Sequence, residues 1–338
     1  MADLFLQLPT GDRREALGVA AASSGRPLHL LDKDVWLVWI LEVLFRAPFS
    51  NHLVFKGGSS LSKAYRIIDR FSEDVDLTYD IRALAPDLVA GDIEPLPPNR
   101  SQEKRWTKEI RTRLPLWIGA RVVPVIASAL SEHGLSAELS TDGEKVFIEY
   151  EPLATGSGYT RSAVMLEFGA RSTGDPWESR PIWCDAAEHL PSVVFPTAVA
   201  RVMRPERTFW EKATAIHAFC GQGEFRGGDR FARHWHDLTR LDRSGTAKTA
   251  IADRALALAV ARHKTAFFAE KNADGSALDY EAAVAGGLRL VPNEKALKSL
   301  SLDYTGMVED GLLFDEAEPF NELMDHCRDL QKRANRTK

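Results

Sequence analysis

Residues 55–63 read Phe-Lys-Gly-Gly-Ser-Ser-Leu-Ser-Lys, and residues 70–79 read Arg-Phe-Ser-Glu-Asp-Val-Asp-Leu-Thr-Tyr. The apolar run that ends at Phe55 predicts a short strand, and the two glycines that follow interrupt it. Ser59 can cap a helix, and apolar residues follow it at helical spacing. A glycine turn that opens a helix leaves backbone N–H groups that suit phosphate oxygens. The first segment therefore predicts a phosphate-binding turn.

The second segment predicts a strand that carries two carboxylates on one face. Asp74 and Asp76 are two residues apart, while Val75 and Leu77 point to the other face. At about 3.3 Å per residue, their Cα atoms lie roughly 6–7 Å apart, which lets both carboxylates share one or two divalent cations. Each segment alone also suits an ordinary turn or a solvated strand end, but together and in this order they favour metal-dependent phosphate chemistry.

The two segments resemble the polymerase-β-like nucleotidyltransferases, and more narrowly the AbiEii/AbiGii toxin family, which includes the MenT-like toxins of type IV toxin–antitoxin systems. The resemblance implies transfer of a nucleoside monophosphate from a nucleoside triphosphate, with release of pyrophosphate. It implies that Asp74 and Asp76 hold Mg²⁺ or Mn²⁺. The residues expected at the nucleotide are Lys56, Gly57, Gly58, Ser59, Ser60, Lys63, Ser72 and Lys212.

A third metal-binding carboxylate is expected on a neighbouring strand, as the resemblance implies. Residues 163–168 predict a strand whose apolar side chains share one face and whose Glu167 lies on the other. We place the third carboxylate at Glu167, and Met165 on the same face suggests partial burial. An ordinary exposed glutamate is the alternative.

Two later helices, at residues 206–219 and 230–241, resemble further motifs of the toxin family. The implied roles are Lys212 on the triphosphate and Asp237 as an orienting or ion-pairing partner. A solvated lysine and a structural salt bridge are the alternatives. His234 and His236 lie about 200° apart on a helix, so they do not favour a shared zinc site with His217 and Cys220.

Composition places the chain among reduced globular proteins. Of its 338 residues, 44% are hydrophobic and 27% charged, and the net charge of −5 means that a nucleic acid must be met by a local basic patch. The three cysteines are far apart, and there is neither a signal-peptide pattern nor an 18-residue uncharged apolar run. We therefore expect a cytoplasmic protein.

The expected fold is α+β, with a nucleotidyltransferase lobe containing a mixed sheet over residues 1–190 and a mostly helical lobe over 191–338 that completes the active-site cleft. Residues 35–45 predict a buried helix that Asp32 or Asp34 could cap. A basic helical insertion is expected near 100–133, as either a solvated face or an RNA contact with Trp106 and Trp117 available for stacking. The candidate RNA-binding residues are Lys104, Arg105, Lys108, Arg111, Arg226 and Arg230.

The expected function is that of a type IV toxin acting on RNA. The nucleoside triphosphate could be GTP or CTP, the acceptor is the 3′ end of tRNA as in the MenT relatives, and a neighbouring gene would encode the antitoxin. Ser72, two residues before Asp74, could touch a phosphate, and phosphorylation there would repel an incoming triphosphate. Two rivals stay open: a transferase of the same fold that modifies a small molecule or a protein hydroxyl, and a non-catalytic regulator that binds GTP or RNA.

Overall fold

The computed structural model describes residues 3–89, 95–155, 163–223, 225, 230–309, 312–314 and 316–336. The chain forms two compact units. Unit 1 comprises Met1–Ala64, Phe71–Pro95 and Arg105–Met203, and unit 2 comprises Tyr65–Arg70, Leu96–Lys104 and Arg204–Lys338. The main division follows Met203 rather than the expected residue 190, because β9 (Thr197–Met203) pairs with β2 (Leu53–Lys56) and β7 (Trp177–Trp183) of unit 1.

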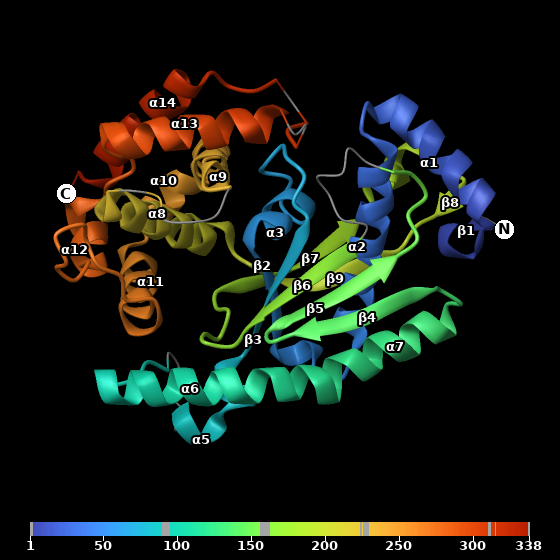
Figure 1. Ribbon diagram of the computed structural model, residues 1–338, viewed down its shortest axis with the longest axis horizontal. Helices are drawn as coiled ribbons and strands as arrows, with labels where there is room; N and C mark the ends of the chain where they lie inside the picture. Colours follow the sequence, from blue (N-terminus) through green and yellow to red (C-terminus); the bar gives the residue numbers. More distant parts are fainter. Residues whose placement is uncertain are drawn as a thin grey trace. The chain divides into compact units, whose positions relative to one another are not determined.

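Unit 1 is built on a mixed sheet, whose strands are drawn as arrows in Figure 1. The strand order among the described residues is β4-β5-β6-β3-β2-β9-β7, with β3 parallel to β6 and antiparallel to β2. The α+β prediction is therefore confirmed. The other strands of this sheet are β2 (Leu53–Lys56), β3 (Asp74–Tyr79), β4 (Ala137–Asp142), β5 (Lys145–Tyr150), β6 (Ala163–Gly169) and β7 (Trp177–Trp183); β1 (Asp3–Leu4) and β8 (Val193–Val194) form a separate parallel pair.

The predicted strands at 52–55, 74–79 and 163–168 are confirmed as β2, β3 and β6. Strands β4 and β5 form a hairpin. The dipeptide Asp142-Gly143 is a favoured turn pair, but the turn lies one residue later. Asp142 pairs with Lys145, so the two turn residues are Gly143 and Glu144, with Gly143 at φ +57°. That left-handed conformation suits glycine, which explains the position of the turn.

Helix α2 (Leu28–Arg46) packs against β9 and β6 and confirms the predicted buried helix. It begins earlier than the sequence predicted. Asp32 and Asp34 therefore lie inside the helix and are buried, and neither caps it. The other helices of this part of the chain are η1 (Phe5–Gln7), α1 (Thr10–Ser24), η2 (Ser50–His52), α3 (Gly57–Lys63), α4 (Ile81–Leu84), α5 (Pro86–Val89), α6 (Arg100–Trp117), η3 (Ile118–Val122), α7 (Val123–Glu132) and η4 (Asp185–His189).

Helices α6 and α7 confirm the predicted helical region at 100–133. A π-helical turn, η3, separates them just before Pro124, whose missing N–H cannot complete the regular helical ladder. Within the described residues, the stretch Arg100–Glu132 is long and apolar enough to cross a membrane by length and composition, although the sequence predicted no such segment. This criterion alone is weak support, because core helices of ordinary globular proteins also meet it.

Unit 2 is helical in its described residues. Trp210 and Trp235 lie at its core with no exposed surface, and their indole N–H groups donate to the carbonyls of Ala250 and Leu290 at 2.9 and 2.8 Å. Each buried indole is thus satisfied, as core packing requires. The helices are α8 (Pro205–Gln222), α9 (Ala232–Arg243), α10 (Thr246–Ala252), α11 (Arg254–Phe267), α12 (Tyr280–Ala282), η5 (Ala283–Gly287), α13 (Glu294–Glu309) and α14 (Phe320–Ala334).

Candidate functional site

Strand β3 places Asp74 and Asp76 on one half-exposed face of the sheet, while Val75 and Leu77 are buried on the other. This arrangement follows from the alternation of side chains along a strand. On the neighbouring strand β6, Glu167 is the register partner of Asp76. Register partners project to the same face, so all three predicted metal ligands face the same side of the sheet.

A charged row crosses the sheet at the level of Asp76. Lys56 of β2 pairs in register with Asp76, and Lys145 of β5 pairs with Glu167. The Lys145 ammonium lies 3.3 Å from the Glu167 carboxylate, whose side chain is 49% exposed. Glu167 is therefore exposed and paired with Lys145, rather than partly buried as the sequence suggested. Lys145 is a candidate site residue that the sequence analysis missed, since only the strand register reveals it.

Gly57 is the residue that lets the turn approach β3. Its φ is +78°, and a Cβ atom at this position would overlap the carboxylate of Asp76. A side chain here would be strained by its backbone conformation and would also collide. The backbone of the turn and the Asp76 carboxylate are therefore adjacent, with no side chain between them.

The hydroxyls of Ser59 and Ser60 face the protein. Ser59 Oγ donates to the carbonyl oxygen of Asp74 and, at 3.5 Å, to that of Ser72, while Ser60 Oγ donates to Gly57 O at 2.9 Å. Both serines have no exposed surface. Ser59 does not cap the helix, because α3 begins at Gly57. Its hydroxyl instead ties α3 to the start of β3, so a phosphate contact in this turn would come from the backbone.

Lys63 lies at the end of α3, where the sequence predicted a nucleotide contact. Its ammonium is 2.5 Å from Asp34 Oδ1 and 2.5 Å from Asp185 Oδ1, and its side chain is only 7% exposed. Burial alone would lower the pKa of Lys63, but the two carboxylates raise it. The lysine is thus charged and held by two acidic partners within unit 1.

In unit 2, Lys212 and Asp237 belong to one buried cluster. Lys212 Nζ lies 2.9 Å from Asp237 Oδ2, and Arg70 donates to both carboxylate oxygens at 2.7 and 2.8 Å. Burial would raise the pKa of Asp237, but Arg70 and Lys212 hold it well below its usual value. The sequence predicted the pairing role of Asp237 and missed Arg70, which precedes the segment Ser72–Asp76.

The basic residues of α6 are exposed. Lys104, Arg105, Lys108 and Arg111 all face solvent, whereas Trp106 is buried at 4% exposure. Trp117 stacks on Tyr79 with ring centroids 4.0 Å apart. The expected stacking partners for RNA bases are therefore occupied by the core, which leaves phosphate contacts as the chemistry this helix can offer. Arg226 lies outside the described residues, and Arg230 is half-buried with its backbone N–H bonded to Asp303 at 2.7 Å.

The donor set on β3 and β6 fits a hard divalent cation. Carboxylate oxygens are the ligands that Mg²⁺ and Mn²⁺ prefer, and Gly57 brings the backbone of the turn against the Asp76 carboxylate. In the part of the chain that the structure describes, no three His, Cys, Asp or Glu side chains already converge on one point. Asp74 and Asp76, with Glu167 one strand away, are the candidate ligands for such an ion.

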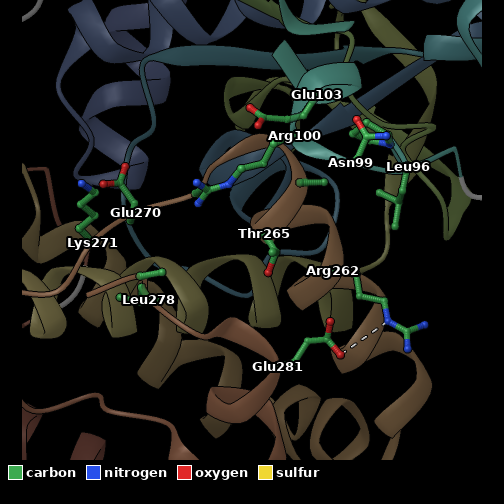
Figure 2. A pocket seen from close by; sticks show the side chains of 14 residues that line it. Leu96, Asn99, Arg100, Glu103, Arg262, Thr265, Glu270, Lys271, Leu278 and Glu281 are labelled. Atoms are coloured by element: carbon green, nitrogen blue, oxygen red, sulfur yellow. Dashed lines mark ion pairs between the residues drawn. The ribbon is translucent and has the colours of Figure 1, made fainter. Parts of the chain in front are cut away.

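A pocket of about 360 Å³ lies elsewhere, in unit 2, between the start of α6 and the end of α11 (Figure 2). The residues that line it include none of the predicted site residues. Arg262 pairs with Glu281 across its rim at 3.7 Å. Its acidic and basic side chains balance, so its lining does not select a charged ligand. The charged residues are Arg100, Glu103, Arg262, Glu270, Lys271 and Glu281.

Comparisons with known proteins identify the family. Residues 39–326 match the family described as nucleotidyl transferase AbiEii toxin of type IV toxin–antitoxin systems. No curated protein matches the sequence. Two solved structures are similar in fold: the nucleotidyltransferase toxin MenT4 from Mycobacterium tuberculosis H37Rv (15% identity, 95% of this chain and 99% of that chain, TM-score 0.41) and a protein from H. pylori assigned as a nucleotidyltransferase (15% identity, 92% and 96%, TM-score 0.40).

The family match covers most of the sequence, including both segments of the signature at 55–79 and both helices that carry Lys212 and Asp237. The chain is therefore a nucleotidyltransferase that belongs to the AbiEii toxin family of type IV toxin–antitoxin systems.

Proposed function

We propose that this nucleotidyltransferase transfers a nucleoside monophosphate from a nucleoside triphosphate, GTP or CTP, to the 3′ end of an RNA, with tRNA as the acceptor. The observation that carries the proposal is the position of Asp74 and Asp76 on one face of β3, with Asp76 directly beside the Gly57 turn. A divalent cation bound there would neutralise charge that develops on the phosphoryl oxygens.

The residues of the chain then have separate tasks. The backbone of Gly57 and Gly58 binds phosphate oxygens of the triphosphate, and Lys212 adds a cation to them. The acceptor hydroxyl forms a new bond to the α-phosphorus while the bond to the leaving pyrophosphate breaks. The proton of the hydroxyl passes to a carboxylate, either Asp76 or Glu167, and from there to water.

The acceptor is proposed from its charge. An RNA is a polyanion, and Lys104, Arg105, Lys108 and Arg111 form an exposed basic face on α6 in a chain whose net charge is −5. Such a face binds phosphates without reading sequence, so it would position an RNA and not select its bases. The antitoxin is proposed to be the product of a neighbouring gene.

The test is incubation of the protein with each α-labelled nucleoside triphosphate, Mg²⁺ and total tRNA. We expect label in the tRNA band, and loss of that label in Asp74→Asn and Asp76→Asn. Asp142→Asn, an exposed aspartate at the end of β4, is the matched control and should stay active. Label that enters protein or small molecules would move the activity to another acceptor, and no pyrophosphate release with any acceptor would contradict the proposal.

A further inference from the structure

Helix α2 buries three consecutive charged residues. Asp32, Lys33 and Asp34 are 3%, 4% and 1% exposed, respectively. Charged side chains are rarely this buried unless each has a partner that offsets the loss of hydration. Consecutive residues on a helix point about 100° apart, so the three side chains must reach three different neighbours.

Asp34 reaches α3, the helix that follows the glycine turn. Its Oδ1 lies 2.5 Å from Lys63 Nζ, and its Oδ2 accepts the backbone N–H of Asp185 at 2.6 Å. Asp185 Oδ1 also lies 2.5 Å from Lys63 Nζ, and Asp185 forms a second ion pair with Arg26. The end of α3 is thus fixed to α2 through a single buried lysine.

Lys33 reaches the other half of the signature. Its ammonium lies 3.8 Å from Glu73 Oε2, and the Glu73 side chain is 8% exposed. Glu73 directly precedes Asp74, the first residue of β3. A movement of Glu73 would therefore displace the backbone that carries the first of the two acidic ligands.

Asp32 reaches the chain after β5. Its Oδ2 accepts the backbone N–H of Leu153 at 2.9 Å. Burial raises the pKa of Asp32 to about 6, against the opposing effects of this hydrogen bond and of Arg13. Burial and the nearby Asp185 likewise raise the pKa of Asp34 to about 6, against the opposing effect of Lys63. Both carboxylates are therefore held in α2 at a cost in hydration.

We propose that Lys33 and Asp34 are positioning residues, which fix the glycine turn (residues 57–63) and the segment 72–76 relative to each other by binding Lys63 and Glu73 from one rigid helix. The inference rests on the proposed function in so far as these two segments hold nucleotide and metal. An apolar helix of the same shape would be as stable or more so, since buried ion pairs seldom add net stability. What the charged residues add is a defined position, and a displacement of about 1 Å can cost roughly 100-fold in rate.

The test separates position from stability with a charge-balanced double variant. Asp34→Asn with Lys63→Met removes both partners, so no unpaired lysine remains and Asp185 keeps Arg26. We expect its melting temperature to recover relative to either single variant, while kcat stays at least 10-fold below that of the wild-type protein and KM for the triphosphate changes less than threefold. Asp329→Asn with Lys332→Met, an exposed Asp–Lys pair on α14, is the matched control.

Hydrogen exchange gives a readout that does not depend on activity. Amides of residues 57–63 and 72–76 should exchange faster in the double variant, with those of β5 unchanged. Lys33→Met should accelerate exchange at residues 72–76 and leave residues 57–63 unchanged. In Lys33→Arg, exchange at 72–76 should return to the wild-type rate. Recovered stability together with full kcat, or unchanged exchange in these segments, would overturn the proposal. If exchange changes as expected but the wild-type protein transfers no nucleotide, the positioning role stands and the proposed function fails.

Discussion

The two units each bury an aspartate against a lysine, yet the two aspartates behave in opposite ways. In unit 1, Lys63 lies between two carboxylates, Asp34 and Asp185, and the pKa of Asp34 rises to about 6 because of burial and the second carboxylate. In unit 2, burial acts in the same direction on Asp237, but two cations face it and hold its pKa well below the usual value. The direction of the pKa shift therefore depends on the number of cations relative to carboxylates, and not on the presence of a lysine alone.

The number of partners that each lysine has determines how easily Lys63 or Lys212 could turn toward a nucleotide. Lys63 is shared by two acids, so moving it would leave both with one partner fewer. Asp237 already accepts two hydrogen bonds from Arg70, so Lys212 can move away from it at a smaller cost in free energy. We therefore propose Lys212 as the lysine that a triphosphate attracts and Lys63 as the one that stays in place.

Asp237→Asn should have the largest effect on stability. It removes the buried carboxylate that Arg70 and Lys212 share, and removing one partner of a buried charge cluster costs about 3–5 kcal/mol. Hydrogen exchange of the α8 and α9 amides should report this loss as faster opening within unit 2. Protection equal to that of the wild-type protein would show that the cluster does not stabilise these helices.

Lys212→Ala should affect activity more than stability. Losing a cation that stabilises transferred charge typically costs about 3–4 kcal/mol in the transition state, or roughly 100- to 1,000-fold in kcat. The melting temperature should fall less than in Asp237→Asn, because Asp237 keeps Arg70. Steady-state kinetics with a labelled triphosphate measures the first effect. A large drop in melting temperature with normal kcat would reverse the assignment of the two lysines.

Lys63→Met should destabilise unit 1 by about 1–3 kcal/mol, the cost of a buried polar group that loses its partner, which is less than the effect of Asp237→Asn on unit 2. The difference arises because Asp34 can take up a proton at moderate cost and Asp185 keeps Arg26. Hydrogen exchange at α3 provides the measurement. A loss as large as that in unit 2 would mean that Asp34 stays ionised without its lysine.

The contribution of Asp32 to the pH dependence of the free energy of unfolding should be the smallest of these effects. Its folded pKa of about 6 lies above the usual 3.8, so its contribution to stability is present below pH 3.8 and is lost as the pH rises through 6. Between pH 7 and pH 5 the wild-type protein should therefore gain about 1 kcal/mol over Asp32→Asn. Denaturant unfolding of both proteins at the two pH values tests this, and a gain in the opposite direction would place Asp32 among the carboxylates with lowered pKa.

Local patterns were sufficient to predict β2, α3, β3 and the shared face of the two aspartates. These patterns are the apolar run that ends at Phe55, the Gly57-Gly58 pair and the alternation of side chains in Asp74–Tyr79. These features are local, because strand period and glycine conformation depend on neighbouring residues. The predictions of where α3 begins and ends and where α2 begins were less accurate. Propensity alone did not show that α2 begins at Leu28 and buries the charged residues Asp32, Lys33 and Asp34.

The contacts that the sequence analysis missed are long-range. Lys33 with Glu73 and Arg70 with Asp237 join residues that are 40 and 167 positions apart, and the row from Lys56 to Lys145 depends on strand register. Nothing in the local pattern of a lone lysine separates a solvated side chain from a buried one. Only the packing of α2 on the sheet, or of α8 on α9, decides it.

The central claim is that Asp74 and Asp76 hold the metal for nucleotide transfer beside the Gly57 turn. Its most direct measurement is the transfer of an α-labelled nucleoside monophosphate to total tRNA by Asp74→Asn, Asp76→Asn and the Asp142→Asn control, with binding of Mn²⁺ followed in parallel. We predict that both site variants lose transfer and bind Mn²⁺ weakly while the control does neither. Normal transfer by either site variant would contradict the claim.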